Sequence, residues 1–303
     1  MILEVVFLGT GASVPSRERS LPCTAVRRES DITLFDCGEG SQRQLMCSSL
    51  SFMKVERIMV SHLHGDHVLG IPGLLQTMSL SGRSRPLTIA GPAGLEDAVR
   101  SMLDLCQGDL AFSLYIQEMA PGERLIAPGF DILAVEGRHN MESLSYVYRE
   151  EPRSGRMYKS RLHEMGIPEG ALYSSLQRGE TVEWQGRRIT AAEVRGPERP
   201  GRGVAYSGDT LPNPDFQEAA RGVDVMVHES TFSQAEAGLA KSHFHSTARQ
   251  AAEIAKNAEA SILVLMHVSS RYKDPAPLLE EARAVFPDTH LAHDFFRLLV
   301  PLR

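Results

Sequence analysis

Short apolar runs alternate with amphipathic segments over most of the chain. Apolar runs bounded by Gly, Pro or Asp are typical of buried strands, whereas apolar positions three and four residues apart are typical of helices. These patterns predict strands at 2–8, 32–35, 55–60, 87–90, 112–117, 130–136, 203–206, 223–227, 262–266 and 295–300. They predict helices at 41–48, 68–80, 95–105, 248–257 and 278–286, with a hairpin over 184–194.

The strand-then-helix order recurs in both halves of the chain, but long intervals lack a crossover helix. Such intervals disfavour a purely parallel sheet. We therefore predict an α/β fold in which two mixed sheets pack face to face with helices outside, forming one domain over residues 1–303. Residues 149–185 are predicted to be a projecting arm, because residues 149–161 hold five basic residues against two acidic ones. A solvated loop explains the same composition.

Composition places the chain among ordinary globular proteins, with 42% hydrophobic and 23% charged residues. No apolar run approaches the roughly 18 residues that span a bilayer, and the acidic N-terminal segment does not resemble a signal peptide. The net charge of −6 means that any RNA binding must use local basic patches. Four cysteines without a Cys-x-x-Cys pair predict buried free thiols in a reducing compartment such as the cytoplasm.

The segment from Ser61 to His67 carries the strongest chemical signal, because it holds three histidines and an aspartate directly after an apolar run. In extended chain, His62 and His64 point to the same side, and Gly65 permits the turn that aims Asp66 and His67 nearby. Imidazole nitrogens with a carboxylate, and no thiolate, suit Zn²⁺ or Mn²⁺. This spacing predicts two metal ions close together; the other interpretation is a polar turn rich in histidine by chance.

Further candidate ligands follow other predicted strands: His139, Asp209 and His267. Ligand sites of open α/β sheets gather at the carboxyl ends of strands, so these side chains are expected to join the histidine cluster. Taken singly, Asp209 could be a turn aspartate and each histidine a core or surface residue.

The loop after the first strand begins with two glycines but lacks the third glycine of a dinucleotide loop. It carries Pro15, Arg17 and Arg19, and we expect these residues to grip phosphate. A solvated charged turn is the other interpretation.

The order of these motifs resembles the ribonuclease Z (tRNA 3′-endonuclease) family of the metallo-β-lactamase superfamily. Matching blocks cover nearly the whole chain: 7–11, 35–44, 61–67, 70–75, 206–210, 228–232, 245–248 and 267–272. The resemblance implies an αβ/βα four-layer sandwich with 149–185 as a flexible substrate-binding arm. Its arm motif survives only as Ile167–Tyr173.

The resemblance also implies a site with two Zn²⁺ ions, or Mn²⁺ in their place. One ion belongs to His62, His64 and His139, the second to Asp66, His67 and His267, and Asp209 bridges them. Asp66 would be the general base, and His245, oriented by Glu229, would assist the leaving oxygen. Pro15, Arg17 and Arg19 match the family's substrate-contacting loop, in which Ser20 here replaces the usual asparagine.

These features predict a cytoplasmic, homodimeric, zinc-dependent endoribonuclease that removes the 3′ trailer of precursor tRNA and leaves a 3′-hydroxyl. An alternative is a metal-dependent phosphodiesterase acting on other small or RNA diesters, or an arylsulfatase-like enzyme, because the metal site would look the same. A third hypothesis is an RNA-binding protein that keeps metals but has no turnover; the intact Asp66, Glu229 and His245 speak against it.

Overall fold

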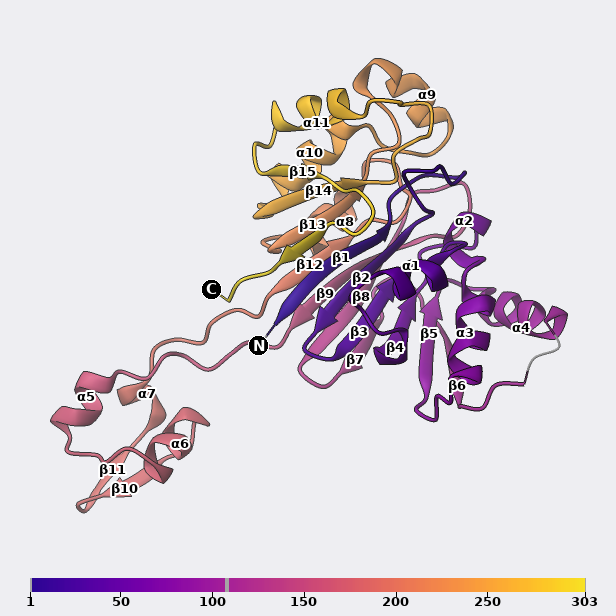
Figure 1. Ribbon diagram of the computed structural model, residues 1–303. Helices are drawn as coiled ribbons and strands as arrows, with labels where there is room; N and C mark the ends of the chain where they lie inside the picture. Colours follow the sequence, from indigo (N-terminus) through magenta and orange to yellow (C-terminus); the bar gives the residue numbers. More distant parts are fainter. Residues whose placement is uncertain (1, 107–108, 303) are drawn as a thin grey trace. The chain divides into compact units, whose positions relative to one another are not determined.

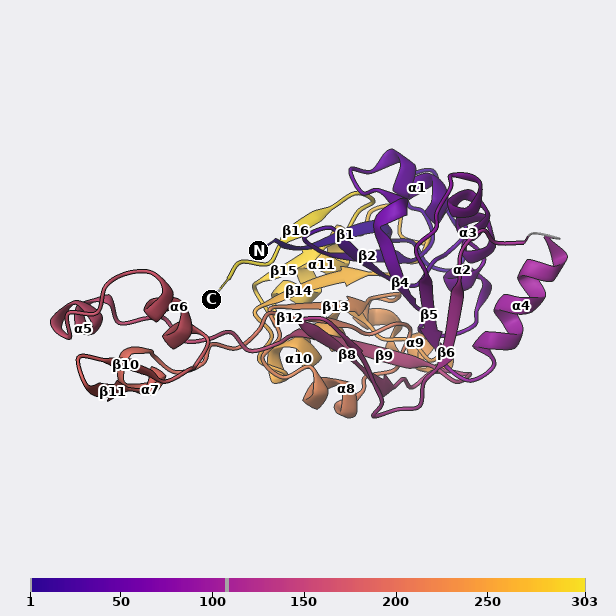
Figure 2. The same ribbon diagram turned by 90° about the horizontal axis from the view of Figure 1, so that it is seen from below.

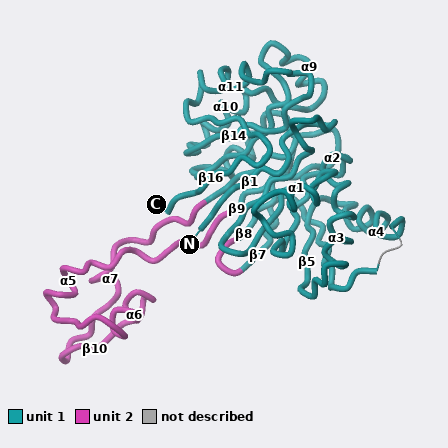
Figure 3. The backbone as a smooth tube through the Cα atoms, in the orientation of Figure 1, with its two compact units in different colours: residues 1–127, 131–148, 203–302 teal, residues 128–130, 149–202, 303 magenta. Residues whose placement is uncertain are grey.

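The computed structural model describes residues 2–106 and 109–302, which divide into two compact units (Figure 3). Unit 1 contains the described parts of 1–127, 131–148 and 203–302, and unit 2 contains 128–130 and 149–202. The second unit begins where the predicted arm begins and ends at 202 instead of 185. Within the described residues, no helix is long and apolar enough to cross a bilayer.

The first seven-stranded sheet of unit 1 has the order β16-β1-β2-β3-β4-β5-β6. Its first four strands pair antiparallel, and the pairs from β3 to β6 are parallel, so the sheet is mixed. The strands are β1 Leu3–Gly9, β2 Cys23–Arg28, β3 Asp31–Phe35, β4 Val55–Met59, β5 Leu87–Gly91, β6 Leu114–Glu118 and β16 Arg297–Leu299.

The second sheet has the order β15-β14-β13-β12-β9-β8-β7, and its strands β12 to β15 pair in parallel. Parallel pairing brings the carboxyl ends of β12, β13 and β14 to the same edge of the sheet. The strands are β7 Arg124–Ala127, β8 Phe130–Glu136, β9 Leu144–Glu150, β12 Gly203–Tyr206, β13 Val225–Glu229, β14 Ile262–Met266 and β15 Thr289–Leu291.

The two sheets face each other through large buried side chains: the ring of Phe35 lies 5.9 Å from that of Tyr146 and 5.3 Å from that of Tyr206. Helices α1, α3 and α4 cover the outer face of the first sheet, and α8, α10 and α11 cover that of the second (Figures 1 and 2). The predicted four-layer α/β sandwich is confirmed. The helices of this unit are α1 Ser41–Cys47, α2 Gly65–Val68, α3 Ile71–Leu80, α4 Leu95–Leu105, α8 Pro214–Ala219, α9 Ala237–Ser242, α10 Ala248–Asn257 and α11 Ala276–Arg283, with 3₁₀ turns Phe52–Lys54 and Gln234–Glu236.

Some local predictions were wrong. The helix expected over 68–80 is interrupted at 69–70, where the Gly70 N–H donates to the Cys37 carbonyl oxygen at 2.9 Å and a Cβ on Gly70 would lie 2.1 Å from the Gly38 carbonyl oxygen. Strands β2, β7, β9 and β15 were not predicted. In β9, the hydroxyl of the buried Tyr146 donates to the Val60 carbonyl oxygen at 2.6 Å, a partner that only the fold supplies. Two of the four free cysteines are exposed, contrary to the expectation that all would be buried: Cys47 and Cys106.

Unit 2 has an apolar core of its own, built around Leu162, Leu176 and Ile189, where the sequence suggested no apolar periodicity. The predicted hairpin occupies 182–189 and is followed by a short helix with a capping box. A buried ion pair joins the ends of the unit: the Arg202 guanidinium donates to both carboxylate oxygens of Glu150 at 2.7 and 2.8 Å. The elements are α5 Lys159–Glu164, α6 Ala171–Gln177, β10 Val182–Trp184, β11 Arg187–Ile189 and α7 Ala191–Val194.

Candidate metal centre

The first sheet supplies four of the predicted ligands from one connection, between the end of β4 and the short helix α2. His62 is fully buried and His64 is half-buried, and their side chains converge: Nε2 of His62 lies 2.9 Å from Nδ1 of His64. Asp66 and His67 lie in α2, and their side chains face the same cluster. The structure therefore brings the side chains of this segment together in space.

The second sheet supplies the other ligands from the ends of β8, β12 and β14. Asp209 follows Gly208, which has φ +57°, and a Cβ on this glycine would lie 2.7 Å from the Cβ of Ser61. Glycine therefore lets the Asp209 loop approach the histidine segment. His267 also has a left-handed backbone, with φ +57°, and histidine is among the residues more often found there.

The predicted ligands form two adjoining groups. One contains the ring nitrogens of His62, His64 and His139, and Nε2 of His139 lies 3.3 Å from Nδ1 of His64. The other contains Asp66, His67 and His267, whose donor atoms lie within 4.8 Å of one another.

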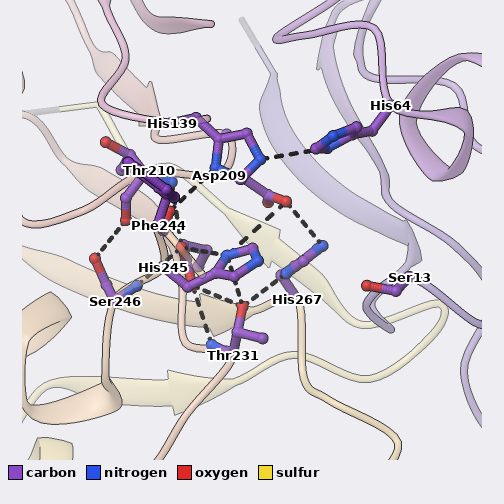
Figure 4. A network of polar contacts seen from close by, with 12 residues as sticks. Ser13, His64, His139, Asp209, Thr210, Thr231, Phe244, His245, Ser246 and His267 are labelled. Atoms are coloured by element: carbon purple, nitrogen blue, oxygen red, sulfur yellow. Dashed lines mark hydrogen bonds and ion pairs between the residues drawn. The ribbon is translucent and has the colours of Figure 1, made fainter. Parts of the chain in front are cut away.

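Asp209 lies between the two groups. Its Oδ2 lies 3.8 Å from Nε2 of His62, 3.4 Å from Nε2 of His67 and 3.3 Å from Nε2 of His267. The same oxygen thus faces both sets of nitrogens, as the predicted bridging ligand requires. Figure 4 shows Asp209 between His139 and His267.

The donor set fits divalent cations. Nε2 of His67 and Nε2 of His267 are buried and make no hydrogen bond within the described residues, although each faces the carboxylates of Asp66 and Asp209. A buried nitrogen without a partner is costly, and a cation between it and the carboxylates would satisfy both.

The pKa values of the three histidines in the first group agree with a role in binding a cation. Burial lowers the pKa of His62, His64 and His139, which favours the neutral imidazole that binds a metal.

The ring nitrogens on the far side of the ligand histidines are held by hydrogen bonds. Nδ1 of His62 contacts the Ser61 hydroxyl at 3.0 Å, and Nδ1 of His139 contacts the Phe244 carbonyl oxygen at 3.1 Å. Nδ1 of His267 contacts the Thr231 hydroxyl at 2.8 Å. Such partners fix the tautomer and the orientation of a metal-binding imidazole. No pattern in the sequence indicates this role for Thr231.

Asp36 is a second residue that the sequence analysis assigned no role. Its fully buried carboxylate accepts hydrogen bonds from the Ser61 N–H at 2.7 Å and the Ser61 hydroxyl at 2.8 Å. It also contacts Nδ1 of His67 and the hydroxyl of Tyr206, each at 2.7 Å. The sequence signals for Asp36 were its place in the Asp36–Gly40 turn after a strand and in block 35–44 of the family resemblance. Asp36 therefore connects the strand end, a ligand histidine and the second sheet.

His245 and Glu229 form a pair beside the ligands, as predicted. Nδ1 of His245 lies 2.9 Å from Oε1 of Glu229, whose carboxylate is buried and also accepts from backbone N–H groups of Thr210, Thr231 and Ser246. Burial opposes protonation of His245, but the charge and hydrogen bond of Glu229 outweigh it and raise the pKa of His245 to about 9. The His245 ring lies 5.3 Å from the ring of His139 and 5.4 Å from that of His267. The Glu229 carboxylate therefore favours a protonated His245 imidazole next to the candidate metal ligands.

The predicted phosphate-gripping loop reaches the site only in part. Pro15 lines a cavity of about 460 Å³ together with His64 and Asp66. Arg17 is exposed. Arg19 is half-buried, and its Nη1 donates to the Ala292 carbonyl oxygen at 2.6 Å and to the Thr10 hydroxyl at 2.7 Å.

The chain resembles known proteins along its whole length. It is 41% identical to ribonuclease Z of Methanosarcina acetivorans, covering 100% of this chain and 99% of the relative, and 40% identical to that of Enterococcus faecalis, covering 99% and 98%. The chain belongs to the ribonuclease Z family. Family profiles described as a β-lactamase superfamily domain and as the anti-Pycsar protein Apyc1 match residues 169–268 and 3–108.

Ribonuclease Z structures agree with this assignment. The crystal structure of the short form of human tRNase Z is 28% identical, with a TM-score of 0.72, covering 99% of this chain and 100% of that one. The family and the metallo-β-lactamase fold predicted from the sequence are confirmed, as is an enzyme of the ribonuclease Z type.

Proposed function

We propose that this ribonuclease Z family member is a zinc-dependent endoribonuclease that removes the 3′ trailer from precursor tRNA and leaves a 3′-hydroxyl. One observation carries the proposal: seven side chains that could hold metal ions converge from two sheets beside a buried Glu229–His245 pair. When bound there, two Zn²⁺ ions, or Mn²⁺ in their place, would supply Lewis acidity that lowers the pKa of water toward neutrality and stabilises charge on phosphoryl oxygens.

The protein's own groups complete the chemistry. Asp66 is the proposed general base that orients the attacking water. Burial alone would favour its neutral form, but the neighbouring His267 and His67 hold the pKa of its carboxyl below the usual range, so it is ionised at neutral pH. His245 keeps its proton up to about pH 9 and donates it to the 3′ oxygen of the tRNA as the P–O bond breaks. Glu229 holds the imidazole in place.

The loop after β1 and the separate unit 2 supply candidate RNA contacts. Pro15 lies beside the site, and the exposed Arg17 can reach phosphate. Contact of Arg19 with substrate stays a prediction, because its Nη1 is hydrogen-bonded within the protein.

Unit 2 carries a basic cavity that supports its proposed role as a flexible substrate-binding arm. The cavity, of about 770 Å³, is lined by Arg156, Lys159, Arg178 and Arg199 with Tyr173. Residues 149–202 include eleven Lys and Arg against eight Asp and Glu, in a chain with a net charge of −6. Such a cavity suits the phosphate backbone of RNA, with an aromatic ring available for stacking.

A cytoplasmic location and a homodimer complete the proposal. All four cysteines are free, which suits a reducing compartment. The dimer rests on the family resemblance, and light scattering of the purified protein tests it.

The deciding experiment incubates the purified protein, after metal analysis, with precursor tRNA, mature tRNA and a chromogenic phosphodiester. We expect cleavage of precursor tRNA at the base of the trailer, with a 3′-hydroxyl on the tRNA product. The variant Asp66→Ala should still bind tRNA but should lose cleavage. Turnover of the small diester without cleavage of precursor tRNA would support the alternative phosphodiesterase, and binding without any turnover would support an RNA-binding protein.

A further inference from the structure

The loop after β1 touches a metal ligand through its backbone. The N–H of Ser13 donates to Oδ2 of Asp66 at 2.9 Å, and Ser13 has a left-handed backbone conformation, with φ +55°. The same Oδ2 faces Nε2 of His67 at 3.5 Å and Nε2 of His267 at 3.6 Å. Within the described residues, Ser13 supplies the one backbone donor to this carboxylate. The loop therefore holds the oxygen that faces the second group of metal-binding nitrogens.

The base of this loop is tied to the strand end that carries His267. The Ala12 N–H donates to the Val268 carbonyl oxygen at 3.2 Å, and the Val268 N–H donates to the Thr10 carbonyl oxygen at 3.1 Å. Asp66, a ligand of the proposed second ion, thus accepts a hydrogen bond from this loop. His267, another ligand of that ion, directly precedes Val268, which is hydrogen-bonded to the loop. A displacement of the loop would alter both.

Asp294, near the C-terminus, anchors the two ends of the loop. Its Oδ1 accepts from the hydroxyl of Thr10 at 2.8 Å, and its Oδ2 accepts from the N–H of Ser20 at 2.7 Å and from Nε2 of Gln44 at 2.9 Å. Arg19 closes the network, because its Nη1 donates to the Thr10 hydroxyl as well as to the Ala292 carbonyl oxygen. Thr10 is fully buried, so its hydroxyl has no water to replace these partners.

We propose that Asp294, Thr10 and Arg19 are positioning residues for Asp66, acting through the backbone of Ser13. The inference deepens the proposed function, because Asp66 matters only as ligand and base of that site. It also gives Arg19 a role inside the protein, distinct from RNA contact. Since Pro15 and Arg17 lie in the same loop, contact with RNA and the geometry of Asp66 depend on one anchored segment.

The test compares Thr10→Val, which keeps the shape but removes the hydroxyl, with Thr10→Ser, which keeps the hydroxyl. We expect Thr10→Val to lower the Zn²⁺ affinity measured by chelator competition, and kcat on a chromogenic phosphodiester, by on the order of tenfold or more. KM for the diester should change less than kcat, because Asp66 is proposed to act in the chemical step. Thr10→Ser should restore both values to near those of the wild type.

Asp294→Ala is the second variant, and Asp31→Ala is its control. Asp31 accepts two hydrogen bonds from Arg57, at 2.7 and 2.9 Å, outside this network. Asp294→Ala should reproduce the loss, whereas Asp31→Ala should leave Zn²⁺ affinity and kcat unchanged.

Thermal unfolding of each variant separates a misfolded protein from a misplaced Asp66. A folded Thr10→Val or Asp294→Ala protein with wild-type Zn²⁺ affinity and kcat would overturn the proposal, as would equal losses in Asp31→Ala. Failure of the wild type to cleave precursor tRNA would refute the proposed function instead, because the metal and diester measurements do not involve tRNA.

Discussion

Asp36→Asn is the substitution that tests the architecture of the metal centre most directly. Asp36 is not itself a predicted ligand, but its Oδ2 lies 2.7 Å from Nδ1 of the predicted ligand His67 and so determines which nitrogen of that ring carries the proton. With Asp36 as acceptor, Nδ1 is protonated and Nε2 is left to face Asp66 and Asp209. That tautomer is the one that binds a metal through Nε2.

Asparagine has two possible orientations, and each carries a cost. If its NH₂ group faces His67, the ring must accept at Nδ1 and carry its proton on Nε2, which then cannot bind the cation. If its oxygen faces His67, the NH₂ group meets the N–H of Ser61, which donates to Asp36 at 2.7 Å in the wild type. One buried donor is then unsatisfied, at about 1–3 kcal/mol. This cost corresponds to roughly a 5- to 160-fold loss of affinity for the ion that His67 binds.

The assay measures the zinc content and the Zn²⁺ affinity of folded Asp36→Asn protein, together with its turnover of a chromogenic phosphodiester. We expect weaker binding of one ion and a matching fall in turnover. The matched control is Asp31→Asn, the same substitution at a carboxylate that pairs with Arg57 away from the site. A folded Asp36→Asn protein with two ions at wild-type affinity would refute the reasoning.

Three further predictions concern the site and unit 2. Turnover of precursor tRNA should fall as the pH rises through about 9, where His245 loses its proton. His245→Ala should lower kcat by about 10²-fold or more and abolish this pH dependence. A pH–rate profile that is unchanged in the variant would contradict the assignment of His245 as the general acid. Chelation of metal should abolish turnover of every substrate and lower the melting temperature, both restored by Zn²⁺, and a fully active metal-free protein would exclude the proposed chemistry. A short Gly-Ser linker in place of 151–201 keeps the hydrogen bond from the Glu150 N–H to the Arg202 carbonyl oxygen, at 2.9 Å. This replacement should weaken tRNA binding and reduce its salt dependence but leave diester hydrolysis intact. Equal losses on both substrates would argue against an RNA-binding role of unit 2.

Much of the metal centre could be predicted from the sequence because its ligands follow strands. His62 and His64 lie at an extended i, i+2 spacing, and His139, Asp209 and His267 each stand just beyond an apolar run. The carboxyl ends of neighbouring parallel strands meet at one edge, so local order along the chain becomes proximity in space. The two mixed sheets followed from the same apolar runs, together with the intervals that lack crossover helices.

Other features depend on contacts that no local pattern encodes. The carboxylate of Asp36 gathers groups 25, 31 and 170 residues away in the chain, and Ser13 reaches Asp66 across 53 residues. The sequence indicates that Arg19 binds phosphate, but in the structure its Nη1 donates hydrogen bonds to Thr10 and Ala292 within the protein. The core of unit 2 could not be predicted from the local sequence pattern either, because its apolar residues are scattered among charged ones.

The sequence by itself therefore determined the ligand types, the strand ends that carry them and the family to which the chain belongs. Only the tertiary structure decided which nitrogen of each imidazole faces the site, which carboxylate holds it and how the first loop supports Asp66. The physical reason is that chain order sets which side chains follow a strand, whereas the direction of a hydrogen bond depends on partners that folding brings from distant segments.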